Sequence, residues 1–317
     1  MKREKTEKIK AVVLGHAIAD ALGVSVEFCP REELEAAPVT DMQGFGTYPV
    51  PAGCFSDDTS MALAALESLS GGSFDPHDVM QRLGEWYYNG KYTPTGETFD
   101  VGSTCATAIE NYFEAGMSIS ECGLRGERSN GNGSLMRIHP FALFVWLDAA
   151  ARADWESVID RASALTHAHG RAKLGCKIYT TVLLALLARP EKPSVTLALH
   201  EAACRYRSHA EYTHYERVFS PDFFSLPRDK IKSTGYVVDT LEAALWCLLT
   251  TDSYEECVLM AVNLGDDTDT VAAVAGALAG ALYGREAIPA RWLAMLQKRE
   301  DVEALCERAA TAFIKAK

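Results

Sequence analysis

The stretch 268–283, TDTVAAVAGALAGALY, constrains the fold of this chain more than any other segment. Its spacing predicts a helix with small or apolar residues on every face, so no face suits contact with water. Small side chains also let neighbouring helices approach closely, and residues of these types are usually buried. We therefore predict a central, buried helix here.

The helical period recurs along most of the chain. An early apolar stripe runs from Ala11 to Leu22 and ends near Gly23. Further helices are predicted over 57–70, 76–89, 101–116, 139–150, 154–165, 168–188, 194–209, 236–249, 253–262, 268–283 and 289–316. No alternating strand pattern, fixed-period repeat or Gly/Ser-rich linker stands out. The predicted fold is all-α, with residues 1–317 in one compact multi-helix domain.

Two long segments lack a helical pattern. Residues 29–56 contain four prolines and several glycines, and residues 210–234 mix aromatic residues, prolines and charges. Long irregular segments are more often functional than idle. We predict that 210–234 is a loop or lid that sets substrate choice.

Charge and cysteine content narrow the function classes. The chain has 31 basic and 43 acidic residues, a net charge of −12, which disfavours broad nucleic-acid binding. No uncharged stretch approaches the roughly 20 residues of a membrane span, and the charged N-terminus lacks the apolar core of a signal peptide. Nine cysteines without a C-x-x-C pair suit reduced thiols in a cytoplasm. We expect a cytoplasmic monomer.

Acidic and hydroxyl residues gather at two predicted helix starts. The first is Ser56-Asp57-Asp58-Thr59, and the second is Asp266-Asp267-Thr268-Asp269-Thr270. Capping is one reading, because such side chains accept hydrogen bonds from free N–H groups and suit the helix dipole. Capping, however, needs only one or two oxygens.

A metal site is the other reading of these two helix starts. Packing carboxylates together is unfavourable unless protons or cations neutralise them. All the side chains are hard oxygen donors, which suit Mg²⁺, Mn²⁺ or Ca²⁺. A two-metal site requires that the two segments meet in space, which the sequence leaves open.

Other segments carry weaker signals. Gly131-Asn132-Gly133-Ser134 is a glycine-rich turn whose backbone N–H groups could approach a phosphate, or it is only a flexible turn before a helix. Glu27 after the first helix is by default a solvated residue. Asp100 and His167 each precede a helix, where capping or an ordinary imidazole is the default reading. Nucleophilic catalysis has no positive support, because no serine or cysteine triad order stands out.

Together these segments resemble the ADP-ribosylglycohydrolase family. The matching order is GHAIADALGVSVE at 15–27, SDDTSM at 56–61, FDVGST at 99–104, GNGSLMR at 131–137, TH at 166–167, GYVVDTLEAALW at 235–246 and GDDTDTVAAVAGALAGALYG at 265–284. The resemblance implies an all-α fold and two Mg²⁺ or Mn²⁺ ions. The metal ligands that it implies are Ser56, Asp57, Asp58, Asp267, Asp269 and Thr270.

The same resemblance assigns the remaining site residues. Glu27 matches a glutamate beside the metals, and Asp100 matches an aspartate of the arginine-directed branch near the reacting ribose. Gly131, Asn132, Gly133 and Ser134 would hold the diphosphate and adjoining ribose, while His167 and Tyr236 would line the ADP-ribose cleft.

The sequence departs from the family pattern at both acidic motifs. Ser56 stands where threonine is usual, and a hydroxyl or backbone oxygen remains available there. Asp266 stands where the family has glycine, which would be unfavourable if the position needs a positive φ.

The predicted activity is metal-dependent hydrolysis of the bond between C1 of ADP-ribose and a modified side chain, with arginine favoured by Asp100. Its partner would be an ADP-ribosylated protein or a small-molecule conjugate. Two alternatives remain open. One is a serine-, nucleic-acid- or small-molecule-linked substrate, and the other is a non-catalytic relative that binds ADP-ribose or is structural.

Overall fold

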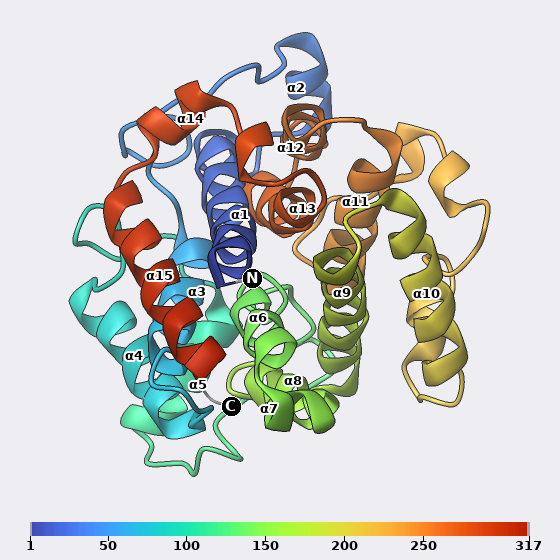
Figure 1. Ribbon diagram of the computed structural model, residues 1–317. Helices are drawn as coiled ribbons and strands as arrows, with labels where there is room; N and C mark the ends of the chain where they lie inside the picture. Colours follow the sequence, from blue (N-terminus) through green and yellow to red (C-terminus); the bar gives the residue numbers. More distant parts are fainter. Residues whose placement is uncertain (1, 316–317) are drawn as a thin grey trace.

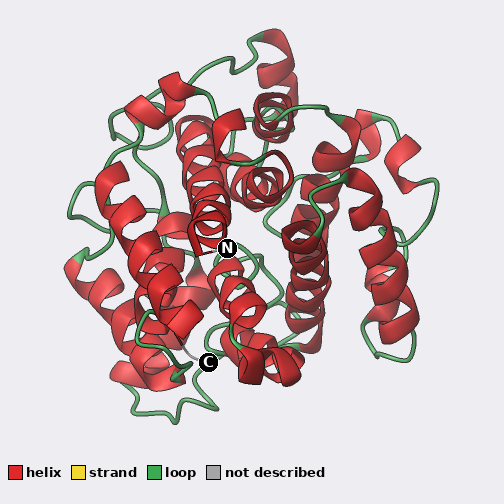
Figure 2. Cartoon of the chain, in the orientation of Figure 1, coloured by secondary structure: helices red, strands yellow, loops and turns green. Residues whose placement is uncertain are grey.

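Helices joined by loops and short turns build the chain in the computed structural model, which describes residues 2–315 (Figure 2). Within these residues, β-pairing is limited to two isolated bridges, Leu124 with His167 and Gly131 with Tyr236. The α-helices are α1 (Lys2–Gly23), α2 (Arg31–Ala36), α3 (Asp57–Leu69), α4 (Pro76–Asn89), α5 (Ser103–Phe113), α6 (His139–Leu147), α7 (Ala149–Ala153), α8 (Trp155–Ala164), α9 (Gly170–Ala188), α10 (Lys192–Tyr206), α11 (Val237–Thr250), α12 (Tyr254–Val262), α13 (Thr268–Tyr283), α14 (Ala290–Met295) and α15 (Arg299–Lys315). The predicted all-α fold is confirmed.

Helix α13 is the centre of the molecule. It is buried from Thr268 to Leu282, and it packs along α1 while α9, α11 and α12 cover its other sides (Figure 1). The predicted central helix is therefore present, and small side chains explain how α1 comes so close.

Glycines make this contact possible. A Cβ built on Gly276 would lie 2.4 Å from the carbonyl oxygen of Gly15, and one on Gly280 would lie 2.0 Å from that of Ala11. Both distances are far inside van der Waals contact, so only glycine lets the two backbones pack at this separation.

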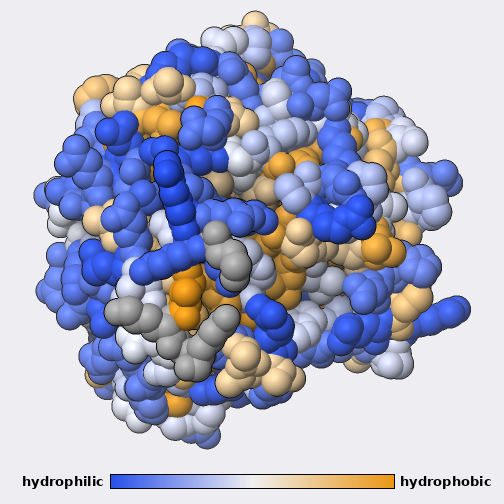
Figure 3. Space-filling model, viewed as in Figure 1, coloured by the Kyte–Doolittle hydropathy of each residue, from blue (hydrophilic) through white to orange (hydrophobic). Residues whose placement is uncertain are grey.

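The first helix is long and apolar enough to cross a membrane by length and composition. The segment from Lys2 to Val26 meets that test, but 94% of its most apolar window is buried inside the protein. Burial of this kind is typical of a core helix, because a spanning helix would present its apolar side chains to lipid. On the face drawn in Figure 3, hydrophilic residues cover most of the surface and hydrophobic ones show as small patches.

Several predicted boundaries differ from the structure. The predicted helix 139–150 is divided at Asp148 into α6 and α7, because the Asp148 side chain caps the start of α7. The predicted final helix is two helices, α14 and α15. Between them the backbone N–H of Gln297 donates to the carbonyl of Gly53 at 2.9 Å, and Lys298 takes a φ of 55°. The irregular segment 29–56 contains the short helix α2, whose first turn carries Glu32 and Glu33, as the helix dipole favours.

The predicted lid, 210–234, holds three short 3-10 turns, η2 (Tyr212–Tyr215), η3 (Phe223–Ser225) and η4 (Arg228–Lys230). Its end is fastened by Arg31, whose guanidinium donates to the carbonyl oxygens of Arg228 at 2.9 Å and Ile231 at 2.6 Å. The carbonyl of Ser233 then accepts the backbone N–H of Asp267 at 3.0 Å. This end of the segment is therefore joined directly to the second acidic helix start.

Candidate active site

The two acidic helix starts meet. Helices α3 and α13 begin beside each other, and the hydroxyl of Thr270 donates to Asp58 Oδ2 at 3.2 Å. The hydroxyl of Ser56 donates to the same oxygen at 3.1 Å. The juxtaposition that the sequence left open is thus present.

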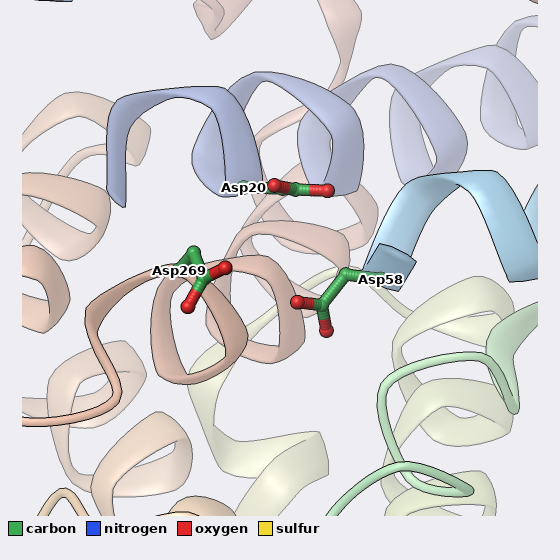
Figure 4. A group of neighbouring side chains, drawn as sticks. All are labelled: Asp20, Asp58 and Asp269. Atoms are coloured by element: carbon green, nitrogen blue, oxygen red, sulfur yellow. The ribbon is translucent and has the colours of Figure 1, made fainter. Parts of the chain in front are cut away.

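A third helix brings another carboxylate to this point. Asp20 on α1 projects toward Asp58 and Asp269, and one oxygen of each lies within 4.8 Å of the others (Figure 4). A second group of this kind consists of Glu27, Asp100 and Asp269. The two groups share Asp269, so the acids form one continuous cluster.

Sequence reasoning missed Asp20. The carboxylate accepts the backbone N–H of Ser56 at 2.9 Å and both the N–H and the hydroxyl of Thr59, at 3.0 and 2.6 Å. It therefore holds the start of α3 against α1. The signal was present in the sequence, since Asp20 interrupts an otherwise nearly uncharged helix between Ala11 and Leu22.

Capping explains only part of the acidic cluster. Ser56 does cap α3, since its hydroxyl accepts the N–H of Asp58 at 3.3 Å. Asp267 sits at the N-cap of α13 without making a side-chain cap. Among the acids of this cluster, four buried carboxylate oxygens have no hydrogen-bond partner within the described residues: Glu27 Oε2, Asp58 Oδ1, Asp267 Oδ1 and Asp269 Oδ2.

Burial sets the electrostatics of these acids. Burial, together with the charges of Asp100 and Asp267, raises the pKa of Glu27 to about 9. Burial likewise holds the pKa of Asp58 and of Asp269 well above the usual range, with added repulsion from neighbouring carboxylates. Such a cluster needs protons or cations, and orphaned oxygens with hard-donor chemistry fit Mg²⁺ or Mn²⁺.

A cavity of about 290 Å³ opens beside the cluster. Glu27, Asp57, Asp267 and Thr270 line its acidic side. Gly131, Asn132, Gly133 and His167 line the same cavity, so the glycine-rich turn and the carboxylates border one space.

Hydrogen bonds fasten that turn to the acidic side. The side-chain amide of Asn132 donates to Asp267 Oδ2 at 2.8 Å and to the hydroxyl of Thr240 at 2.9 Å. A Cβ on Gly133 would lie 2.9 Å from Cε1 of His167, so the absence of a side chain lets the turn approach the imidazole. Asn132 thus joins the glycine-rich turn to the start of α13.

Asp100 lies at the cavity mouth with a positive φ of 53°. The hydroxyl of Tyr48 donates to Asp100 Oδ1 at 2.8 Å, and the Tyr48 ring packs on Phe99. A second strained residue, Phe28, has a φ of 64° and lines the same cavity with 66% of its surface exposed. Sequence reasoning had not singled out Tyr48 or Phe28.

Two of the predicted substrate-binding residues lie outside this lining. Ser134 is fully buried, and its hydroxyl accepts a hydrogen bond from Ser163 at 3.0 Å instead of facing the cavity. Tyr236 follows the lining residue Gly235, and its ring lies 5.9 Å from the guanidinium carbon of Arg171. The other predicted residues lie at the cavity or in the acidic cluster beneath it.

Comparison with known proteins agrees with this geometry. The family model described as ADP-ribosylglycohydrolase matches residues 1–317. The ADP-ribosylarginine hydrolases Tri1 of Serratia proteamaculans and Pseudomonas putida are 34% and 35% identical to the chain, over 96% and 95% of it and 79% and 77% of their own lengths. The ADP-ribosyl-[dinitrogen reductase] glycohydrolase of Rhodospirillum rubrum is 32% identical, over 92% of this chain and 90% of that protein.

A solved structure shows the same architecture. It is described as an ADP-ribosylglycohydrolase-related protein complex, and it aligns with a TM-score of 0.81 and 33% identity over 99% of both chains. The family match and the named relatives define the class of the protein, a glycohydrolase. The chain belongs to the ADP-ribosylglycohydrolase family, and the predicted resemblance is confirmed.

Proposed function

We propose that this enzyme hydrolyses the N-glycosidic bond between ADP-ribose and an arginine side chain, with two Mg²⁺ or Mn²⁺ ions bound at the acidic cluster. The orphaned buried carboxylate oxygens carry the metal part of the proposal. The linkage is supported by the two relatives named as ADP-ribosylarginine hydrolases.

The proposed metal ligands come from the two helix starts. They are Ser56, Asp57, Asp58, Asp267, Asp269 and Thr270. Divalent ions held there would supply Lewis acidity and a template for the ribose hydroxyls. Asp20 would keep the first helix start in place through its three hydrogen bonds to Ser56 and Thr59.

Glu27 would accept the proton of the attacking water. Its carboxylate lines the cavity, and bound cations would lower its raised pKa, so that the group is ionised and able to act as a base. Asp100, oriented by Tyr48, serves one of two roles, donation of a proton to the leaving nitrogen or assistance of ribose-ring opening. Water adds its oxygen to C1 as the C–N bond breaks, and the leaving nitrogen gains a proton.

The glycine-rich turn would hold the ADP portion. Gly131 and Gly133 leave backbone N–H groups open to oxygens of the diphosphate, as expected for a glycine-rich turn. Asn132 is already committed to Asp267 and Thr240, so its side chain would fix the turn in place.

The decisive test measures ADP-ribose release from arginine-modified and serine-modified peptides, each with Mn²⁺, with Mg²⁺ and with EDTA. Release from the arginine peptide alone, abolished by EDTA, is expected. Release from the serine peptide alone would discard the arginine assignment. Binding of ADP-ribose without any release would favour a non-catalytic relative.

The proposal also covers the cellular location and the oligomeric state of the protein. All nine cysteines are free thiols, which supports a reducing cytoplasm. We propose a monomer that acts on an ADP-ribosylated protein or small conjugate and not on nucleic acid in general. Cell fractionation and light scattering of the purified protein test location and assembly.

A further inference from the structure

His167 forms part of the cavity wall with only 2% of its surface exposed. Its Nε2 edge faces the glycine-rich turn, since a Cβ built on Gly131 would lie 3.7 Å from that nitrogen. The other ring nitrogen, Nδ1, lies 2.9 Å from the hydroxyl oxygen of Thr166. Nε2 therefore faces the cavity, whereas Nδ1 faces the side chain of Thr166.

The hydroxyl of Thr166 is also bonded to Arg137. Arg137 Nη2 donates to Thr166 Oγ1 at 2.7 Å. Because a guanidinium only donates, Thr166 must accept this bond, and its own proton is free to be given to His167 Nδ1. Nδ1 is then an acceptor and carries no proton.

The opposite arrangement is less favourable. If His167 Nδ1 donated to Thr166, the hydroxyl proton would be left to the nearby Cys105 thiol, which is a weak acceptor. A buried donor without a good partner is destabilising. The imidazole itself is neutral, because burial and the charge of Arg137 lower the pKa of His167 to about 3.

Arg137 is unusual in its own right. It is fully buried, and although Nη2 bonds to Ala162 and Thr166, its Nε and Nη1 atoms lack partners within the described residues. None of the carboxylates that the structure describes forms an ion pair with it, so its charge acts on its surroundings behind the cavity wall. That charge repels a second proton on His167.

We infer that Arg137 and Thr166 fix the single proton of His167 on Nε2, so that the imidazole presents a neutral hydrogen-bond donor to the cavity. The identity of the acceptor rests on the proposed function, in which it is an oxygen of the diphosphate or adjoining ribose of ADP-ribose. Thr166 and Arg137 are then positioning residues, and neither needs to touch the ligand.

The proton's position matters because the same ring could repel the ligand. With the proton on Nδ1, the lone pair of Nε2 would face an oxygen lone pair. A hydrogen bond to a charged acceptor would be replaced by repulsion, and ADP-ribose affinity would fall roughly tenfold to a hundredfold.

Nitrogen NMR of ¹⁵N-histidine-labelled protein tests the inference directly. The His167 signals are assigned by their loss in His167→Gln. We expect an Nε2–H tautomer in the wild type and in Thr166→Ser, which keeps the hydroxyl. Thr166→Val should shift the ring toward Nδ1–H and weaken ADP-ribose binding, measured by calorimetry.

An Nδ1–H tautomer in the wild type would overturn the inference, even if Thr166→Val failed to fold. Unchanged tautomer and affinity in a folded Thr166→Val would overturn the role of Thr166. These readings need no turnover, so an Nε2–H tautomer with tight ADP-ribose binding upholds the inference even if arginine peptides are not cleaved. Mn²⁺ affinity should be unchanged in Thr166→Val, since Thr166 lies outside the acidic cluster.

Discussion

Asp266, where the family pattern has glycine, should have a measurable effect on the stability of the protein. The sequence raised the question of whether this position needs a positive φ, and the structure gives 60°. Its backbone bonds on both sides to the segment after Glu27, through Phe28 at 2.7 Å and Cys29 at 2.9 Å, so the conformation is fixed. A left-handed conformation is less favourable for a residue with a Cβ than for glycine, although aspartate tolerates it better than most residues.

Asp266→Gly should therefore stabilise the protein, by up to about 1 kcal/mol, because relief of strain exceeds the added entropy loss of glycine. Urea unfolding measures the change. Asp266→Ala is the matched control, since it removes the charge and keeps the strain. Equal stabilisation by alanine would show that charge and not backbone conformation is responsible.

Asp20 is expected to affect the affinity of the site for metal. Asp20→Asn removes the anion that accepts three hydrogen bonds at the start of α3, so the ligands on α3 lose their support. Mn²⁺ affinity should fall by about 10–100-fold, as for other residues that orient metal ligands. Calorimetric titration checks this, with the exposed Asp252→Asn as the control. Equal affinities in the two variants would contradict a supporting role for Asp20.

The close contact of α1 with α13 requires glycine where the two backbones meet. Gly276→Ala would place a methyl 2.4 Å from the Gly15 carbonyl oxygen, and the two backbones would have to separate. We expect destabilisation of about 1–3 kcal/mol or more, measured by thermal unfolding. Gly102→Ala is the control, because a Cβ there meets open space and the loss at this N-cap should stay below about 1 kcal/mol. A Gly276→Ala variant as stable as Gly102→Ala would mean that the pair tolerates a wider spacing.

The helices also show which parts of the fold and of the candidate site the sequence could predict. The central helix was predictable, because small residues on every face leave no exposed side. The break before α15 was not, since it depends on a bond to Gly53 from a distant loop. Likewise, the acids of the two helix starts were visible as local clusters. Asp20 and Tyr48 act only through partners remote in sequence, at Thr59 and Asp100.

For the whole molecule, the buried acids make stability depend on pH when metal is absent. Folding raises the pKa of Asp20 from 3.8 to about 7 and that of Glu27 from 4.5 to about 9. Their contribution to the free energy of unfolding is full below the unfolded pKa values and is lost as pH rises through the folded ones.

The Tm of the EDTA-treated protein should therefore fall between about pH 5 and 9, and the increase in Tm on adding Mg²⁺ should grow over the same range. Differential scanning calorimetry at several pH values measures both quantities. A constant increase in Tm on adding Mg²⁺ across this range would contradict protonated acids at an unfilled site.

The pairing of α1 with α13 also means that this contact can form only late in the synthesis of the chain. Asp20 leaves the ribosome long before Asp269 exists, and at 5–20 residues per second the delay is roughly 10–50 s. During that interval the apolar surface of α1 lacks its main partner, although α3 and α6 can already contact it, so we expect a nascent chain that stalls before α13 to bind chaperones. The carboxylate cluster is completed only near the end of synthesis, so activity cannot precede a nearly finished chain.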